Sequence, residues 1–520
     1  MQEGKKPKHP HPSTGKLEEM RTRTRRAMAG GGPEAAARQH AAGKLTARER
    51  IELLLDGESF EETDLLVHGP EGRNSAGDGV VAGFGRINGR PVCVYAHDYT
   101  VWSGTMGRAQ ARKICKVLDV AFESGIPVVA LCDSAGARLE EGVDSLAGYG
   151  DIFSRHAAAS GYVPQLCAIL GPCAGGAVYA PALTDFVFMV DGISHMYLTA
   201  PELVTSVTGD ACDPESLGGA SQHSKRSGAC HFLAGSEQDC FRQMRELLDY
   251  LPQNCRERAK PVMPSDDPRR CSEVLGAIAE LDPKKAYRIH DVIWEIADGH
   301  QFLEVHKEFA RNIVTGFVRL NGESVGVVAN NPSCLSGALD ISASEKAARF
   351  VRFCDCFNIP LLTLVDVPGY WPGLEQEYNG IIRKGAKLVY AYCQAGVPKV
   401  TVVLRKAYGG AYEVMGSKHL HGDVNFAWPS AEIAVMGPSR AVDILHAERI
   451  QAASDPQAER QTLIAEYVRE HASPYQAARR GYIDEVIDAR ETRPKIIRAL
   501  QFLRHKRVER LPKKHSNIPF

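Results

Sequence analysis

The second half of this sequence repeats the first at a nearly constant spacing, and no other feature limits the fold as strongly. The matched positions are Gly83-Phe84 with Gly316-Phe317, Asn88-Gly89 with Asn321-Gly322, Gly104 with Gly337, Lys113 with Lys346, Ile126-Pro127 with Ile359-Pro360, Asp133 with Asp366, Val163-Pro164 with Val397-Pro398, and Gly175-Gly176-Ala177 with Gly409-Gly410-Ala411. The offset is 233 at first (366 − 133) and 234 later (410 − 176), so one inserted residue separates two aligned halves. A period of this size is a whole domain, not a solenoid unit. We therefore predict a tandem duplication.

Composition sets the class of protein. The 520 residues are 44% hydrophobic and 24% charged, which suits two large globular domains. The net charge of −1 gives no indication of nucleic-acid binding, and no apolar run is long enough to span a membrane. The fourteen cysteines include no Cys-x-x-Cys pair, so we expect reduced thiols, no zinc or other metal site, and a cytoplasmic protein.

Local patterns predict an α/β fold. Residues 15–56 show helical periodicity with a basic bias, interrupted by a glycine-rich turn at 30–33. Apolar β-rich runs then alternate with helical stretches such as 108–124, which indicates buried, mainly parallel strands. The expected strand runs are 92–95, 128–132, 166–170, 325–328, 361–365 and 400–404. We predict a disordered start (1–14), an N-terminal domain (15–260), a linker (261–285) and a C-terminal domain (286–520).

Two Gly-Gly turns are the strongest candidates for chemistry. Each follows a predicted buried strand and precedes a predicted helix, where unpaired backbone N–H groups point toward negative charge. The amides of Gly175-Gly176 and Gly410-Ala411 can therefore stabilise an oxyanion. A single Gly-Gly pair is better explained as a tight strand-to-helix turn, but recurrence in register in both halves favours a site. The turns at Asp133, Ala135 and Gly136 and at Asp366 and Gly369 shape the site or are structural turns.

Several long motifs resemble the carboxyltransferase (β) subunits of biotin-dependent acyl-CoA carboxylases, with the propionyl-CoA carboxylases nearest. The resemblance extends from about residue 14 to the end of the chain. The motifs are Lys44-Leu45-Thr46-Ala47-Arg48-Glu49-Arg50, Gly171-Pro172-Cys173-Ala174-Gly175-Gly176-Ala177, Val365-Asp366-Val367-Pro368-Gly369, Arg405-Lys406-Ala407-Tyr408-Gly409-Gly410-Ala411-Tyr412 and Lys513-Lys514-His515-Ser516-Asn517-Ile518-Pro519. It implies two tandem crotonase-like domains after an N-terminal helical arm, assembled as a homo-hexamer, with each active site between the N-terminal half of one chain and the C-terminal half of another.

The resemblance also implies a mechanism without a side-chain base. Carboxybiotin on a separate carrier releases CO2, the biotin ureido nitrogen takes the α-proton of the acyl-CoA, and the enolate attacks the CO2. By resemblance, Gly175 and Gly176 hold the enolate oxygen in the acyl-CoA domain, and Gly410 and Ala411 hold the ureido oxygen in the carboxybiotin domain. One copy of the fold thus serves each reacting partner.

The sequence lacks the features of the other carboxylase components. None of its ten methionines precedes a lysine, so it has no biotin-attachment motif, and it has no ATP-binding glycine-rich loop. The resemblance therefore implies a separate α subunit that carries biotin and uses ATP and bicarbonate. The basic residues Arg21, Arg23, Arg25 and Arg26 contact that subunit, contact the CoA phosphates, or form a solvated helix face.

Departures from the family pattern concern the acyl pocket. Glu413 stands where propionyl-type subunits have aspartate, and Tyr370-Trp371 replaces a typical Leu-containing run. Either these residues change substrate choice, by about 1–3 kcal/mol, or Glu413 keeps the same contacts in another rotamer. Ala135 stands where relatives often carry glycine.

Three functions remain open from the sequence. The first is a carboxyltransferase that makes methylmalonyl-CoA from propionyl-CoA, or acts mainly on acetyl-, butyryl- or longer acyl-CoA. The second is the same half-reaction run backwards in a decarboxylase or transcarboxylase. The third is a non-catalytic partner in a hexamer, and the intact Gly-Gly turns in both halves argue against it.

Overall fold

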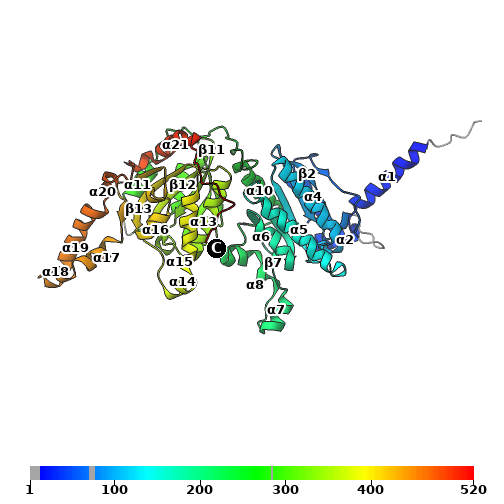
Figure 1. The fold of residues 1–520 in the computed structure, drawn as a ribbon, viewed down its shortest axis with the longest axis horizontal. Coiled ribbons are helices and arrows are strands. Elements are labelled where there is room, and N and C mark those ends of the chain that lie inside the picture. Colours follow the sequence, from blue (N-terminus) through cyan, green and yellow to red (C-terminus); the bar gives the residue numbers. More distant parts are fainter. Residues whose placement is uncertain (1–11, 70–76, 283–284, 520) are drawn as a thin grey trace, which may run out of the picture. The chain divides into compact units, whose positions relative to one another are not determined.

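The computed structural model describes residues 12–69, 77–282 and 285–519. They form two compact units, Met1–His223 with Phe232–Glu246 and Ser224–His231 with Leu247–Phe520 (Figure 1). Residues 1–11 of the expected disordered start lie outside the described residues, and a helix begins at Pro12. The expected linker, 261–285, lies within the range of the second unit.

The first unit is built on an eight-stranded sheet. Its order is β1-β2-β3-β4-β5-β6-β8, with β7 paired to β5. The first two strand pairs, β1 with β2 and β2 with β3, are antiparallel, and the remaining pairs from β3 onward are parallel. The predicted strand runs lie in β3, β4 and β5, which confirms them. The bounds are β1 Glu61–Glu62, β2 Val80–Ile87, β3 Arg90–His97, β4 Val128–Ser134, β5 Gln165–Ala174, β6 Phe186–Val190, β7 His195–Tyr197 and β8 Phe232–Ala234.

The second unit repeats this sheet. Its order is β16-β14-β13-β12-β11-β10-β9, with β15 paired to β13. An antiparallel hairpin, β10–β11, again leads into parallel strands. The predicted runs lie in β11, β12 and β13 and are confirmed. The bounds are β9 Leu303–Val305, β10 Ile313–Leu320, β11 Glu323–Asn330, β12 Leu361–Val367, β13 Lys399–Tyr408, β14 Val424–Ala427, β15 Glu432–Ala434 and β16 Glu485–Val486.

The two hairpins share an unusual detail that supports the duplication. Asn88 and Asn321 both have positive φ, 51° and 52°, which fits the Asn-Gly turns that join twisted antiparallel strands. In the first unit, Asp56 accepts hydrogen bonds from the backbone of the Asn88–Gly89 turn at 3.0 and 2.7 Å. In the second, Asp298 accepts the corresponding bonds from Asn321–Gly322 at 3.1 and 2.7 Å. The repeat is therefore preserved in hydrogen bonding as well as in topology.

Helices cover both sheets. In the first unit α4 packs against α5 and against β2 and β3, and α4 has the predicted bounds of 108–124. The predicted break at 30–33 separates α1 from α2. The bounds are α1 Pro12–Met28, α2 Pro33–Ala41, α3 Ala47–Leu54, α4 Arg108–Ser124, α5 Val143–Ala159, α6 Tyr179–Leu183, α7 Pro201–Thr208, α8 Pro214–Gly218, α9 Ala220–Gln222 and α10 Glu237–Tyr250.

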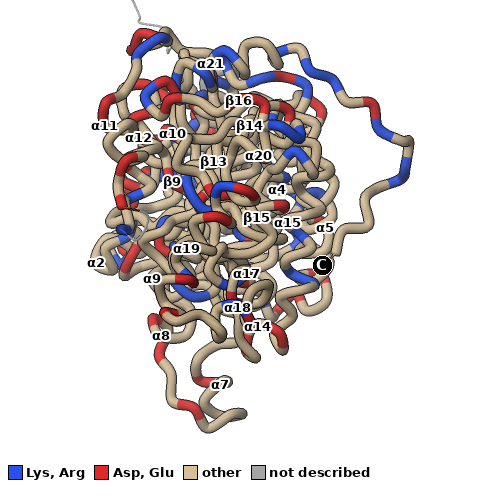
Figure 2. Tube along the Cα trace, turned by 90° about the vertical axis from the view of Figure 1, so that its left-hand side faces the viewer, with Lys and Arg blue, Asp and Glu red and all other residues tan. Residues whose placement is uncertain are grey.

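The second unit has a similar helical cover, in which α13 packs against α15. Its bounds are α11 Glu273–Ala279, α12 Ile289–Ile296, α13 Ile341–Cys356, α14 Leu374–Tyr378, α15 Ile381–Gln394, α16 Gly409–Val414, α17 Pro438–Leu445, α18 Ala447–Ala452, α19 Pro456–Tyr467, α20 Pro474–Arg479 and α21 Thr492–Phe502. Within the described residues, no helix combines the length and apolar character needed to cross a bilayer. Acidic and basic residues are interspersed along the chain (Figure 2), in keeping with the net charge of −1.

Candidate active site

The first Gly-Gly turn follows the end of β5. A short 3-10 helix, η4 (Gly175–Val178), begins there, and Gly175 has a φ of 62°, a conformation that favours glycine. The residue before it, Ala174, provides no side-chain hydrogen bond to cap the helix. Because the first amides of a helix have no acceptor within the helix, they are suited to bind a negatively charged oxygen.

The second Gly-Gly turn has the same construction. It follows β13 and opens α16, Gly409 has a φ of 59°, and Tyr408 gives no side-chain cap. A Cβ atom added to Gly410 would meet no other atom within 4 Å. The space where a side chain of residue 410 would begin is therefore open.

Alignment of the two turns adds a residue that the sequence analysis did not select. Gly175 matches Gly409 by position (409 − 175 = 234) and shares its positive φ. The position equivalent to Ala411 is then Ala177, which is buried just after Gly176. The constant offset of 234 was the available signal for Ala177.

Asp133 proves to be the centre of a buried ionic network. Its side chain is fully buried and accepts hydrogen bonds from Gln39 at 2.8 Å, from Lys44 at 2.9 and 3.0 Å and from Arg50 at 2.8 Å. These partners come from the helical arm, on α2, on α3 and between them. Asp133 therefore fixes the arm to the end of β4, which is a structural role; its part in shaping the site stays a prediction.

Arg50 extends the network to β5 and to the start of α10. Its guanidinium also bonds to both Glu237 carboxylate oxygens at 2.9 Å and to the Leu170 carbonyl at 2.7 Å. Burial alone would lower the pKa of Arg50, but Glu237 and Asp133 raise it above its ordinary value. The arm is thus held to β4, β5 and α10 by one permanently charged side chain.

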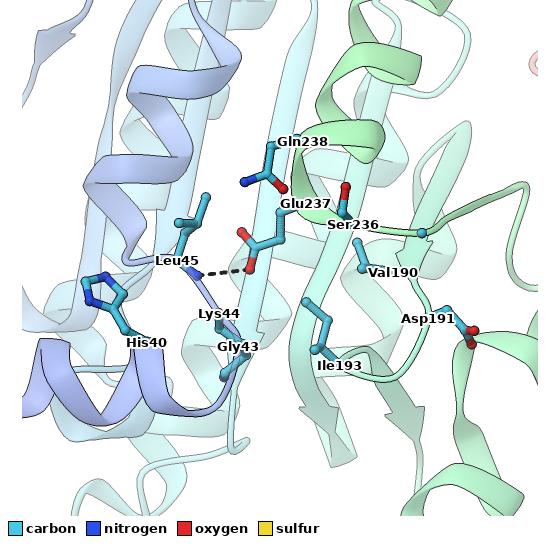
Figure 3. A pocket seen from close by; sticks show the side chains of 11 residues that line it. His40, Gly43, Lys44, Leu45, Val190, Asp191, Ile193, Ser236, Glu237 and Gln238 are labelled. Atoms are coloured by element: carbon cyan, nitrogen blue, oxygen red, sulfur yellow. Dashed lines mark hydrogen bonds between the residues drawn. The ribbon is translucent and has the colours of Figure 1, made fainter.

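A pocket of 320 Å³ opens beside this network (Figure 3). It lies between the α2–α3 connection and the ends of β6 and β8, and the Leu45 amide donates to Glu237 across it at 3.1 Å. Lys44 and Glu237, its charged lining groups nearest the network, are both engaged within the protein. The pocket does not include Gly175 or Gly176.

The amides of the loop after Asp133 are engaged within the protein. The Ala135 amide donates to the Ser103 carbonyl at 3.0 Å, and the Gly136 amide donates to the Ser134 hydroxyl at 3.2 Å. Gly136 has a φ of 108°, and a Cβ there would lie 3.2 Å from the Ala174 carbonyl oxygen. The structure therefore brings this loop against the end of β5, next to the Gly175-Gly176 turn.

Asp366 occupies the matching position in the second unit but has different partners. Its Oδ1 accepts the Lys406 amide at 3.2 Å. Its Oδ2 has no hydrogen-bond partner among the described residues, although the Tyr287 hydroxyl is close enough to act on its pKa. Burial raises the pKa of Asp366, and Lys406 and Arg405 act in the opposite direction.

The difference between the two aspartates has a sequence cause. Arg405 stands at the position of Gly171 (405 − 171 = 234), where a Cβ would lie 2.0 Å from Asp133 Oδ1 and 2.8 Å from the Lys44 ammonium. Glycine at 171 leaves room for a cation from the arm, whereas in the second unit a strand residue, Arg405, supplies the nearby charge itself.

Gly104 and Gly337 support these loops and were seen in the sequence only as a repeated pair. Both have positive φ, 62° and 79°. A Cβ at Gly104 would lie 2.3 Å from the Asp133 carbonyl oxygen, and one at Gly337 would lie 2.4 Å from that of Asp366. Only glycine allows this approach, so recurrence in register was a usable signal for both.

The residues expected to set substrate choice lie on the second unit. Gly369 has a φ of 146° and its carbonyl accepts the Leu339 amide at 3.1 Å. Burial raises the pKa of Tyr370 to about 12, and its ring packs near Gly385 of α15. Trp371 is 43% exposed, and Glu413 is exposed on α16.

The described part of the chain contains no group of three or more histidine, cysteine, aspartate or glutamate residues placed to hold an ion.

Comparison with known proteins identifies the family. The model of the carboxyl transferase domain matches residues 38–518. The propionyl-CoA carboxylase carboxyltransferase subunit of Haloferax mediterranei is 53% identical, over 97% of this chain and 99% of that protein. The methylmalonyl-CoA decarboxylase subunit alpha of Propionigenium modestum is 48% identical over the same shares.

A solved structure agrees across the chain. Transcarboxylase 12S, determined with hydrolysed methylmalonyl-coenzyme A bound, superposes with a TM-score of 0.95 at 47% identity, covering 98% of this chain and 100% of that one. The prediction of two tandem crotonase-like domains is confirmed. The resemblance read from the sequence motifs is confirmed as well. The chain therefore belongs to the carboxyl transferase domain family, as a carboxyltransferase of the acyl-CoA carboxylase type.

Proposed function

We propose that this chain is the carboxyltransferase subunit of an acyl-CoA carboxylase that converts propionyl-CoA to methylmalonyl-CoA. The observation that carries the proposal is the pair of matching strand-to-helix turns at Gly175 and Gly409, one in each unit, each with positive φ and no side-chain cap. The names of the relatives at 53% and 48% identity support acyl-CoA chemistry with propionyl or methylmalonyl groups.

The first turn serves the acyl-CoA. The amides of Gly175 and Gly176 bind the thioester oxygen and stabilise the charge that develops there when the α-proton leaves. Each donor of this kind lowers the barrier by about 3–4 kcal/mol. Since the donors are fixed in the backbone, they need no reorganisation during the reaction.

The second turn serves the carboxyl donor. Carboxybiotin, carried on a separate subunit, supplies the carboxyl group. The open space beside Gly410 fits the ureido ring, and the amides of Gly410 and Ala411 bind its oxygen. Each copy of the fold therefore binds one of the two oxygens that carry negative charge, which accounts for the duplication.

The proposed partners follow from the reaction. A biotin carboxylase and biotin carrier α subunit uses ATP and bicarbonate to charge the biotin. A homo-hexamer is supported by transcarboxylase 12S, whose structure is described as a hexamer assembly. Complete sites then combine the N-terminal half of one chain with the C-terminal half of another.

A second candidate is the reverse half-reaction, the removal of a carboxyl group from methylmalonyl-CoA. It is favoured by the 48% identity to a methylmalonyl-CoA decarboxylase subunit alpha. The same two turns serve either direction, so the partner subunits decide between them. A non-catalytic role is opposed by the intact turns in both units.

The test is a substrate panel. The purified chain is combined with a biotinylated α subunit, and ATP- and bicarbonate-dependent carboxylation of acetyl-, propionyl- and butyryl-CoA is measured. We expect the highest kcat/KM with propionyl-CoA. Preference for another chain length would correct the substrate, and no turnover by a formed complex would favour the decarboxylase.

Shortening Glu413 should shift this preference. Glu413→Asp removes one methylene and restores the residue of the propionyl-type subunits, so we expect the propionyl-CoA to acetyl-CoA ratio of kcat/KM to rise by about 10- to 200-fold, as expected for about 1–3 kcal/mol. Glu448→Asp, on the exposed face of α18, is the matched control and should leave the ratio unchanged. An unchanged ratio in both variants would remove Glu413 from the acyl pocket.

A further inference from the structure

The space under Gly176 is filled by an aromatic ring. Tyr149 lies on α5 and is 4% exposed. A Cβ atom added to Gly176 would lie 3.1 and 3.2 Å from two carbon atoms of the Tyr149 ring. A side chain at position 176 would crowd the ring, so the Tyr149 ring occupies the space next to the Gly176 backbone on the side of α5.

Further rings hold Tyr149 in place. Phe153 stacks on Tyr149 with the ring centroids 5.8 Å apart and an angle of 22°. Tyr179, the residue that follows η4, meets Phe153 edge-on at 6.0 Å and 83°. The aromatic row therefore contacts the turn at both ends, at Gly176 and at Tyr179, and geometry of this kind is favourable for aromatic pairs.

The Tyr149 hydroxyl faces the other loop of the site. It has no hydrogen-bond partner of good geometry among the described residues. Burial raises the pKa of Tyr149, while the nearby Ser134 hydroxyl acts in the opposite direction. The same Ser134 hydroxyl accepts the Gly136 amide at 3.2 Å. Tyr149 therefore lies between the Gly175-Gly176 turn and the loop that begins at Asp133.

The second copy has no such support. At Gly410, the equivalent of Gly176, an added Cβ would meet nothing within 4 Å. An aromatic ring packed against the Gly-Gly turn is thus found in the first unit and not at the matching glycine of the second.

We propose that Tyr149 is a positioning residue of the acyl-CoA turn: its ring sets the place of the Gly176 amide relative to the thioester oxygen. This inference rests on the proposed function. A displacement of an oxyanion donor weakens transition-state binding more than substrate binding. Substitution of Tyr149 should therefore lower kcat and leave KM nearly unchanged.

The first test removes the ring. Tyr149→Leu should lower kcat for propionyl-CoA about 10- to 100-fold, with the KM for propionyl-CoA changed less than about 3-fold. Tyr149→Phe keeps the ring and should retain kcat within about 3-fold. Tyr95→Leu, another buried tyrosine of the same unit, is the control, and it should lower the melting temperature without lowering kcat.

The second test uses the contact itself. Gly176→Ala alone should lower kcat, because its Cβ meets the Tyr149 ring at 3.1 Å. In the Tyr149→Leu background, the fold-decrease in kcat caused by Gly176→Ala should be at least about 5-fold smaller, since the ring is gone. Tyr149→Met replaces Tyr149→Leu if the latter does not fold. If the two substitutions lower kcat independently, so that their effects multiply in the double variant, the inference would be overturned. A Tyr149→Leu variant with a lower melting temperature and an unchanged kcat would also overturn it. No turnover by the wild-type complex would overturn the proposed function and this inference with it.

Discussion

Replacing Gly410 with valine should stop carboxyl transfer while leaving the fold intact. A Cβ atom at position 410 has no atom of another part of the chain within 4 Å, and Gly410 does not have the positive φ of its neighbour Gly409, so we expect the backbone to accept valine. The added methyl groups occupy the space in which the ureido oxygen approaches the amide. Loss of one oxyanion donor lowers kcat by about 100- to 1,000-fold, and we expect an effect of that size.

The measurement pairs kinetics with thermal unfolding. For Gly410→Val we expect kcat to fall as stated, the melting temperature to stay within about 2 °C, and the propionyl-CoA KM to be unchanged. Gly57→Val is the matched control, because Gly57 is also an exposed glycine with open space around it, and it should leave both quantities unchanged. Full activity in Gly410→Val would show that this turn does not meet the carboxyl donor.

Arg50→Met should produce the largest loss of stability. Arg50 is fully buried and pairs with Asp133 at 2.8 Å and with Glu237 at 2.9 Å. Methionine leaves both carboxylates buried with fewer partners, a situation that costs about 3–5 kcal/mol. For a domain of this size the melting temperature should fall by about 6–20 °C.

A surface pair provides the comparison. Arg242 pairs with Asp239 on α10, but its side chain is 65% exposed, so Arg242→Met should cost no more than about 1 kcal/mol. Both variants are unfolded at one protein concentration, because subunit association shifts the midpoint. If Arg50→Met melts within about 2 °C of Arg242→Met, the network does not hold the arm in place.

Much of the fold was predictable because its signals are local or periodic. Buried parallel strands appear in the sequence as short apolar runs, and the duplication shows each run twice. Predicted runs such as 128–132 and 361–365 therefore lie within strands of the structure. The Gly-Gly turns were also predictable, since positive φ at Gly175 and Gly409 depends on residue type at the position itself.

The bracing of the site was not predictable, because it joins residues far apart in sequence. Arg50 and Glu237 are 187 residues apart, and neither carries a local sign of the other. Asp133 and Asp366 match in the repeat, yet only Asp133 receives cations from the arm. That difference depends on Gly171, where the absence of a side chain lets Lys44 approach.

The central claim is that this chain, without another subunit, holds both the acyl-CoA and the biotin ring, each on its own turn. Its most direct test is carboxyl transfer from methylmalonyl-CoA to free biotin by the purified chain without any other subunit. We expect propionyl-CoA and carboxybiotin to form in equal amounts, and Gly410→Val to abolish the transfer while methylmalonyl-CoA still binds. Binding of methylmalonyl-CoA by the folded wild-type assembly with no propionyl-CoA formed would contradict the account.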